Sequence, residues 1–163
     1  MDSKRKFRPV ARLLEALEAE EIRFILIGMS AAVVQGVMET TLDVDIWIDL
    51  PPRQYMRVQQ VARKKGAVVA ANTVVYLEDG TPVNFIFEVD GLGSFAREFK
   101  NTELLKFHGK PVPVLKLERI LKSKKVINRD KDRVHIIHIQ NLLRCRRAAR
   151  LKPKKKSSTR KIS

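Results

Sequence analysis

Residues 43–50 alternate without a break between two kinds of side chain, and this pattern constrains the fold more than any other feature of the sequence. Aspartate or tryptophan occupies every odd-numbered position, whereas valine, isoleucine or leucine occupies every even-numbered one. Successive side chains of a β-strand point to opposite faces of a sheet. The segment therefore predicts a strand with one aliphatic face on a core and one face that carries carboxylates.

A fully apolar segment, Phe24–Ile27, precedes this strand and predicts a buried strand of its own. It ends at Gly28, and Ser30 is suited to cap a short helix over residues 31–37. A glycine that joins a strand to the N-terminus of a helix allows backbone N–H groups to approach a phosphate. We therefore expect the strand, the helix and the returning strand to bring Gly28 and the carboxylates to one edge of a sheet.

Turn signals predict two hairpins in the rest of the chain. Asp79-Gly80 separates the strand-like residues 73–77 and 82–89, and His108-Gly109 separates residues 105–107 and 112–115. Helices are expected from Pro9, from Pro52 to about Lys65, over residues 94–100, from Leu117, and from about Asp130 into the arginines that begin at Arg144. The pattern predicts a mixed β-sheet with packed helices, an α+β fold, in a single domain of residues 1–150.

The positive charge of the chain is concentrated at its ends. The net charge is +15, yet residues 13–143 carry 18 Lys or Arg against 17 Asp or Glu, whereas residues 144–163 carry ten bases and no acid. We interpret residues 151–163 as a disordered basic tail, which either contacts the phosphate backbone of nucleic acid or keeps the protein soluble.

No membrane partner is expected for this chain. The longest apolar run, residues 24–34, is about half of the roughly 20 residues that a membrane helix needs. Cys145 is the single cysteine, which excludes an internal disulfide and favours a cytoplasmic location.

Asp43 and Asp45 form the candidate catalytic pair. Their backbones stand roughly 7 Å apart on a strand and their side chains share a face, so both can bind one hard cation. Mg²⁺ or Mn²⁺ accepts carboxylate oxygens together with substrate phosphates, and phosphoryl transfer depends largely on positioning and charge neutralisation. The alternative for such a pair is a solvated strand face.

In order, the chain reads Phe24-Ile-Leu-Ile-Gly28-Met-Ser30-Ala, then Gly36, then Thr41-Leu-Asp43-Val-Asp45. This succession resembles the nucleotidyltransferase superfamily, and most closely its minimal bacterial branch, which includes abortive-infection nucleotidyltransferases of toxin–antitoxin systems. The resemblance implies Mg²⁺-dependent transfer of a nucleotidyl group from a nucleoside triphosphate to an acceptor such as RNA, another protein or a small hydroxyl compound.

The resemblance also implies roles for particular residues. Gly28 and Ser30 would cradle the phosphates of the nucleotide, whereas Asp43 and Asp45 would hold the metal and take part in catalysis. Two further basic residues, one in a helix and one in an Arg-x-Lys-Asp element, stand where relatives bind nucleotide: Lys124 and Arg129.

Three residues depart from the family pattern: Met29 at the second small position, Glu39 where relatives often carry arginine, and Asn84 at the third catalytic carboxylate. An amide cannot accept a proton at neutral pH, and Glu88 on the same strand face is about 13 Å away. Two functions therefore stay open, an active nucleotidyltransferase and a catalytically degenerate domain of the same fold that binds nucleotide or nucleic acid. A third alternative is an interaction protein whose basic ends bind RNA.

Overall fold

Seven strands form one mixed sheet at the centre of the molecule. The computed structural model describes residues 8–151, so the predicted tail at residues 151–163 lies outside the described residues except for Leu151, which ends the last helix. The strand order is β3-β4-β5-β2-β1-β7-β6. The bounds are β1 Phe24–Ile27, β2 Val44–Ile48, β3 Val68–Ala71, β4 Val74–Tyr76, β5 Pro82–Ile86, β6 Thr102–Phe107 and β7 Lys110–Leu115. β1 runs antiparallel to β2 but parallel to β7, and β2 runs parallel to β5.

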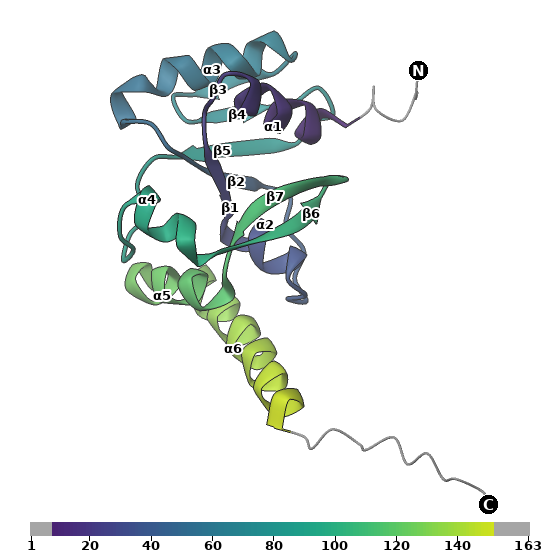
Figure 1. Ribbon diagram of the computed structural model, residues 1–163, viewed down its shortest axis with the longest axis vertical. Coiled ribbons are helices and arrows are strands. Elements are labelled where there is room, and N and C mark those ends of the chain that lie inside the picture. The colour runs from purple at the N-terminus through teal and green to yellow at the C-terminus, as the bar shows by residue number, and fades with distance from the viewer. Residues whose placement is uncertain (1–7, 152–163) are drawn as a thin grey trace, which may run out of the picture.

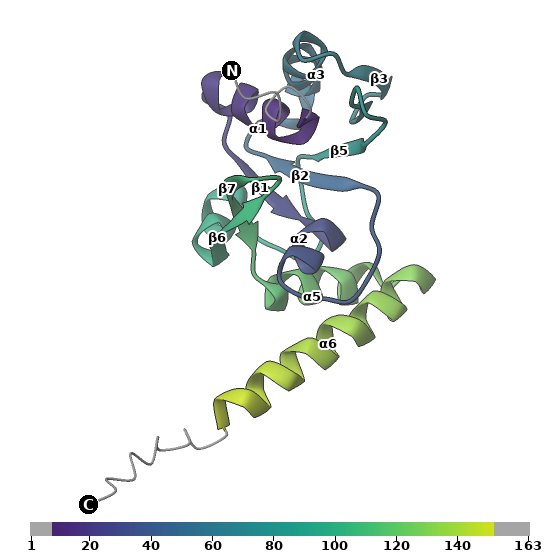
Figure 2. The ribbon, with the colours of Figure 1, turned by 90° about the vertical axis from the view of Figure 1, so that its right-hand side faces the viewer.

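The helices gather on opposite sides of the sheet. α1 (Pro9–Ala19) and α3 (Tyr55–Lys64) lie together on one side, whereas α5 (Leu117–Ile127) and α6 (Asp130–Leu151) lie on the other (Figure 1 and Figure 2). Shorter helical segments fill the connections: α2 Gly28–Val34, α4 Phe95–Glu98, and the 3-10 turns η2 Pro52–Gln54 and η3 Phe99–Asn101. The predicted α+β class is confirmed, and within residues 8–151 no helix is long and apolar enough to cross a membrane.

The strand predicted from the alternating segment is a central strand with both faces covered. Val44, Ile46 and Ile48 are buried as predicted, but Trp47 on the carboxylate face is buried as well. The indole N–H of Trp47 donates to the carbonyl of Phe87 at 3.2 Å. β2 lies between β1 and β5, so its carboxylate face opens toward solvent at Asp45 rather than along its whole length.

Both predicted hairpins are confirmed. β4 and β5 pair antiparallel around Asp79-Gly80, where Gly80 has a φ of +85° and the Asp79 carboxylate accepts the N–H of Thr81 at 3.0 Å. β6 and β7 pair antiparallel around His108 and Gly109, which have φ values of +50° and +78°. Left-handed residues at these positions are what tight hairpin turns require.

Besides the strand predicted over residues 82–89, which ends at Ile86, two local features differ from the predictions. α2 begins at Gly28 rather than at residue 31, so Ser30 lies inside the helix and the extended residue Ile27 is its N-cap. The left-handed φ of Gly28, +65°, lets the chain pass from β1 directly into α2. The second error is β3, an outer strand that was not predicted because three of its four residues are exposed and leave no alternating pattern.

Candidate functional site

The carboxyl end of β1 meets the start of β2 at Gly28 and Asp45. Ile27 is the register partner of Asp45, and Gly28 follows with its left-handed backbone. A Cβ atom at position 28 would overlap the Oδ2 atom of Asp45. Glycine is therefore required at this position for two reasons, the left-handed backbone angle and the close approach of the Asp45 carboxylate.

Ser30 fixes the backbone of Asp45 from behind. Its hydroxyl accepts the N–H of Asp45 at 3.3 Å and donates to the carbonyl of Ile27 at 3.0 Å, so one buried side chain joins β1, α2 and β2. Met29, the neighbouring departure from the family pattern, is 6% exposed and packs into the hydrophobic core. Its side chain therefore does not stand where a phosphate would approach Gly28.

Asn84 lies directly beside Asp45. The parallel pairing of β2 with β5 puts the two residues in register, and the Asn84 amide donates to Asp45 Oδ1 at 2.8 Å. The position that would hold a third carboxylate therefore holds a neutral donor bonded to the carboxylate that is present.

Burial raises the pKa of the Asp45 carboxyl above its ordinary value, and the nearby charge of Asp43 raises it further. The hydrogen bond from Asn84 and the positive charges of Lys124 and Lys131 act in the opposite direction without cancelling the effect of burial. No cation of residues 8–151 forms an ion pair with Asp45. A partly desolvated carboxylate without such a partner is a suitable ligand for a bound cation.

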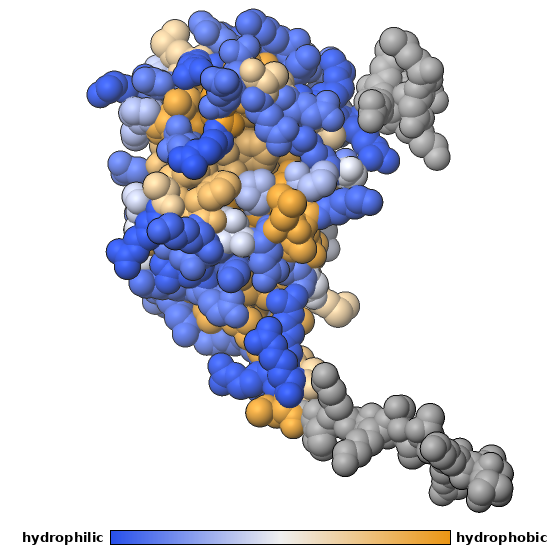
Figure 3. Space-filling view, in the orientation of Figure 1, coloured by the Kyte–Doolittle hydropathy of each residue, from blue (hydrophilic) through white to orange (hydrophobic). Residues whose placement is uncertain are grey.

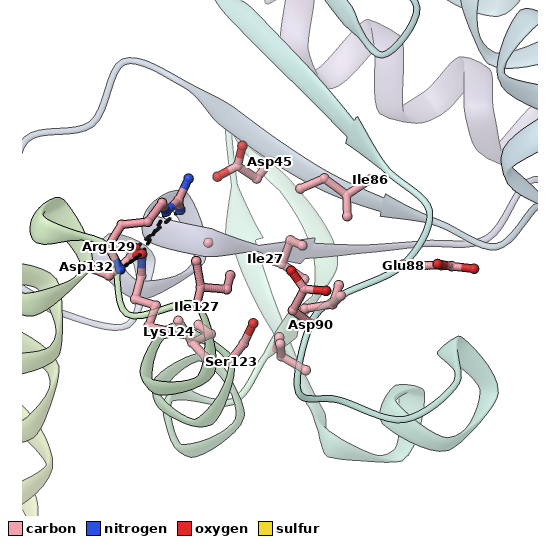
Figure 4. A pocket seen from close by; sticks show the side chains of 14 residues that line it. Ile27, Asp45, Ile86, Glu88, Asp90, Ser123, Lys124, Ile127, Arg129 and Asp132 are labelled. Carbon is pink, nitrogen blue, oxygen red and sulfur yellow. Dashed lines mark hydrogen bonds and ion pairs between the residues drawn. The ribbon is translucent and has the colours of Figure 1, made fainter.

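A pocket of about 260 Å³ opens in front of this edge of the sheet (Figure 4). Its apolar lining comes from residues at the ends of β1, β5 and β7 and along α5, among them Ile27, Ile86, Leu115 and Ile120. Its charged lining is Asp45, Glu88, Asp90, Lys124, Arg129 and Asp132. The strands and the loop after β5 supply acids, whereas the α5–α6 junction supplies both bases and one acid.

The α5–α6 junction is held by one fully buried carboxylate, Asp132. Its oxygens accept the Arg129 Nε–H at 2.8 Å, the Arg129 backbone N–H at 3.1 Å and the Lys124 ammonium at 3.2 Å. Burial by itself would raise the pKa of Asp132, but the bonds from Arg129 and Lys124 outweigh it and hold that pKa well below its usual range. The Lys124 ammonium also contacts the His135 Nδ1 atom at 3.1 Å.

The structure brings together some of the predicted site residues but not all of them. Gly28, Asp45, Lys124 and Arg129 line the pocket, and Asn84 contacts Asp45. Three of the predicted residues do not line the pocket: Asn84, which only contacts Asp45, Ser30, which is buried behind Asp45, and Asp43, which is exposed just before β2.

Glu39, the residue that replaces a frequent arginine, lies in the loop before Asp43. It pairs with His138 of α6 at 2.7 Å between Oε2 and Nδ1. The loop that leads to Asp43 is thereby tied to the last helix of the structure.

Sequence reasoning missed Asp90 as a pocket residue and dismissed Glu88 because of the length of an extended strand. β5 ends at Ile86, so the chain leaves the extended conformation before either acid. The Asp90-Gly91 pair was the available signal for a turn at this point.

This mixed sheet, with helices on both sides and a pocket where β1 ends beside β2, is the nucleotidyltransferase fold. The antibiotic-resistance factor ANT(2'')-Ia matches with a TM-score of 0.54 and 15% identity over 91% of this chain and 96% of the other. The lincosamide antibiotic adenylyltransferase LnuA, solved with lincomycin bound, matches with a TM-score of 0.54 and 15% identity over 82% of this chain and 96% of the other.

A Thermotoga maritima protein assigned to the nucleotidyltransferases matches with a TM-score of 0.50 and 17% identity, over 92% of this chain and 96% of the other. At these identities the likeness is one of fold. No protein-family model matches the sequence, and no curated protein matches it.

Proposed function

We propose that this protein binds a nucleoside triphosphate with Mg²⁺ and transfers a nucleotidyl group to an acceptor hydroxyl. The observation that carries the proposal is the contact of Gly28 with Asp45 at a pocket whose opposite side presents Lys124 and Arg129. Phosphate binding needs exposed backbone N–H groups and cations, and metal binding needs unpaired carboxylates. The fold shared with known nucleotidyltransferases supports the same conclusion.

The chain offers a donor set that fits Mg²⁺ or Mn²⁺. Asp45 is partly desolvated and carries no ion pair to residues 8–151, and Asp43 is exposed close by on the same segment. Within residues 8–151 no three histidine, cysteine or acidic side chains form a complete metal site, so substrate oxygens would complete the coordination of a cation held by this pair. Bound there, Mg²⁺ would neutralise phosphate charge and polarise the reacting phosphoryl group.

The other residues would orient the nucleotide. The backbone at Gly28 begins α2 and can approach a phosphate without a side chain in the way. Arg129 is held by Asp132 but about half of its side chain is exposed, at 54%, so the guanidinium keeps donors for a phosphate. Ser30 supports the site by holding the Asp45 backbone, and its hydroxyl is already engaged at both ends.

A second candidate function is nucleotide binding without transfer. Asn84 favours it, because an amide donor at hydrogen-bond distance from Asp45 stabilises the carboxylate and cannot accept a proton. In that case the domain would bind nucleotide or nucleic acid as a regulatory partner, and no product would form from any acceptor.

The proposal also covers the class of acceptor and the place in the cell where the protein works. RNA or another protein is the acceptor expected for an abortive-infection type of enzyme that works in the cytoplasm. A small hydroxyl compound is the alternative, and the fold neighbours include a lincomycin-bound adenylyltransferase. Three arginines at the end of α6 support a nucleic-acid partner, since Arg144, Arg147 and Arg150 are exposed and lie beyond every acid of the chain.

The first test is binding. Mg²⁺ with a nucleoside triphosphate should raise the melting temperature of the protein. At a ligand concentration of a hundred times Kd, the free energy of unfolding should rise by about 2.7 kcal/mol. The double variant Asp43→Asn with Asp45→Asn should lose this response. Asp49→Asn is the matched control, because Asp49 follows the same strand but pairs with Arg23 at 2.8 Å. An unchanged response of the double variant would refute the site.

The second test separates the two candidate functions. Radiolabelled nucleoside triphosphates are incubated with the protein, Mg²⁺ and total RNA or protein, and label in a macromolecular product is measured. Product that disappears in the Asp43–Asp45 double variant supports transfer. A metal-dependent shift in melting temperature, with neither labelled product nor release of pyrophosphate, identifies the binding domain instead.

A further inference from the structure

The site lacks a proton acceptor at position 84, where the resemblance to nucleotidyltransferases implies a carboxylate. Asn84 donates to Asp45, so neither side chain is free to take a proton from an acceptor hydroxyl while Asp45 holds a cation. Asp132 is fully buried and its two oxygens are bonded to Arg129 and Lys124. Two of the four carboxylates that line the pocket are thereby committed to other partners.

The remaining two carboxylates are Glu88 and Asp90, in the loop that follows β5. Neither forms an ion pair with a residue in the range 8–151. In Figure 4 the Asp90 side chain turns into the pocket beneath Ile27, whereas the Glu88 carboxylate points away from it. Of these two acids, only Asp90 turns its carboxylate into the pocket that Gly28 and Asp45 also line.

Asp90 sits on a turn that is fixed at both sides. The N–H of Leu92 donates to the carbonyl of Val89 at 3.2 Å, which closes a tight turn around Asp90 and Gly91. Gly91 has a φ of +79°, and a Cβ there would come within 2.6 Å of the Val126 side chain of α5. The backbone of the turn is thus packed closely against α5, in a conformation that favours glycine.

A second anchor lies just upstream of this turn. The buried indole of Trp47 donates to the carbonyl of Phe87 at 3.2 Å and so ties the loop to the central strand β2. Asp45 lies two residues before Trp47 on that strand. The loop that carries Asp90 and the carboxylate at the reacting centre are therefore held by the same rigid element, which is the arrangement that a precise proton transfer requires.

We propose that Asp90 is the general base of this site and takes the role that Asn84 cannot fill. This inference rests on the proposed nucleotidyl transfer. As the acceptor oxygen attacks the α-phosphorus of the nucleotide, its proton passes to a carboxylate oxygen of Asp90. The bond from the α-phosphorus to the oxygen that bridges to the β-phosphate breaks, and pyrophosphate leaves with that oxygen. Deprotonation of Asp90 by solvent restores the starting state.

The alternative role for an acid on this wall is to bind a positively charged group of the acceptor. The two roles differ in kinetics, because loss of a general base lowers kcat, whereas loss of a binding contact raises KM for the acceptor. They also differ in pH dependence. Without the base, the rate should keep rising with pH as the acceptor hydroxyl ionises unaided, while the wild-type rate levels off.

The experiment measures pyrophosphate release from each of the four nucleoside triphosphates with Mg²⁺, which reports transfer to any hydroxyl, water included. Asp90→Asn should lower kcat by about 10²–10⁴-fold. The KM for the nucleotide and the nucleotide-dependent rise in melting temperature should stay unchanged. Glu103→Gln is the control, because Glu103 is an exposed acid outside the pocket, and it should keep wild-type turnover. Asp90→Ser serves as a second variant if the first does not fold.

The most direct test is whether a second substitution restores the lost rate. Asn84→Asp introduced into Asp90→Asn restores a carboxylate beside the reacting centre and should recover a large part of the lost rate. Wild-type kcat in Asp90→Asn, or a raised acceptor KM at unchanged kcat, would overturn the general-base assignment while the transfer function stands. No pyrophosphate release by the wild-type protein would overturn both, and a surviving Mg²⁺–nucleotide shift in melting temperature would then identify a binding domain.

Discussion

Gly28 and Asp45 constrain each other at the scale of single atoms, and this leads to a prediction about Gly28→Ala. The new Cβ would overlap the Asp45 carboxylate, and the residue would also be forced into a left-handed conformation that costs about 1–2 kcal/mol. The variant should lose stability and should lose the rise in melting temperature caused by Mg²⁺ with nucleotide. Calorimetry with and without ligand measures both effects.

The matched control is Gly80→Ala. Gly80 has a similar φ of +85°, but nothing lies within 4 Å of a Cβ at that position. It should therefore show the conformational cost alone and keep the response to ligand. A ligand response that survives in Gly28→Ala would show that the close approach to Asp45 does not matter for binding.

The pKa of Asp45 predicts a pH dependence of the metal-free protein. A carboxyl whose folded pKa is raised binds more protons when folded, so its contribution to stability falls as pH rises from about 4 through the folded pKa. Asp45→Asn should therefore be more stable than the wild type at pH 7, with a difference that shrinks toward pH 4. Urea denaturation in the presence of EDTA between pH 4 and 7 measures this. A difference that does not change with pH would contradict the prediction.

The position of Asn84 beside Asp45 was open to sequence reasoning, because the Asp79-Gly80 turn sets which residues of β5 share a face. The inward orientation of Asp90 was not, because it depends on where β5 stops and on how closely Gly91 packs against Val126. The bond between Ser30 and Asp45 was missed for a similar reason, since the true start of α2 follows from the backbone angle of Gly28.

At the scale of elements, the junction of α5 and α6 depends on one buried carboxylate, and Asp132→Ala should test it. Removing a partner from a buried ion pair costs about 3–5 kcal/mol, because the remaining charge, here that of Lys124, stays desolvated. Denaturant unfolding should show a loss of this size.

Asp130→Ala is the control for that junction, since Asp130 lies two residues away in the same helix with a fully exposed side chain. It should leave stability unchanged. The contribution of Asp132 should also be lost in acid, because its pKa is lowered and its stabilisation is complete only above the ordinary aspartate pKa of about 4. Equal stability of the two variants would contradict the importance of the buried pair.

Elements with strong local signals were predictable. The two glycine turns defined two hairpins, and the apolar run of β1 defined a buried strand. β3 was not predictable, because it buries little and pairs through its backbone with β4. The order of strands and the packing of Lys124 against Asp132 and His135 depend on contacts between separate elements, which residue periodicity does not record.

At the scale of the whole molecule, α6 extends away from the sheet and ends in a cluster of arginines. Figure 3 shows hydrophilic side chains along its visible face. Arg144, Arg147 and Arg150 are exposed, and within residues 8–151 none of them forms an ion pair. Arg146 instead donates to the carbonyl of Gln35 in the loop after α2.

Deletion of residues 152–163 tests the predicted tail. It removes six basic residues and should leave the melting temperature unchanged, while affinity for a nucleic-acid duplex falls and its dependence on salt becomes flatter. Each lost phosphate contact reduces the slope of log K against log salt by about 0.9. Arg144→Gln with Arg147→Gln is the comparison for the ordered helix. An unchanged slope after deletion would assign any binding to α6 instead.

The projection of α6 gives the molecule a permanent electric dipole. Along the helix axis the exposed arginines stand about 18 to 27 Å from Asp132, whereas the Debye length at physiological ionic strength is about 8 Å. The field of the arginines therefore guides a polyanion toward the helix but is screened out before it reaches the pocket. Added salt should slow such an encounter and leave the intrinsic rate of any reaction in the pocket unaffected.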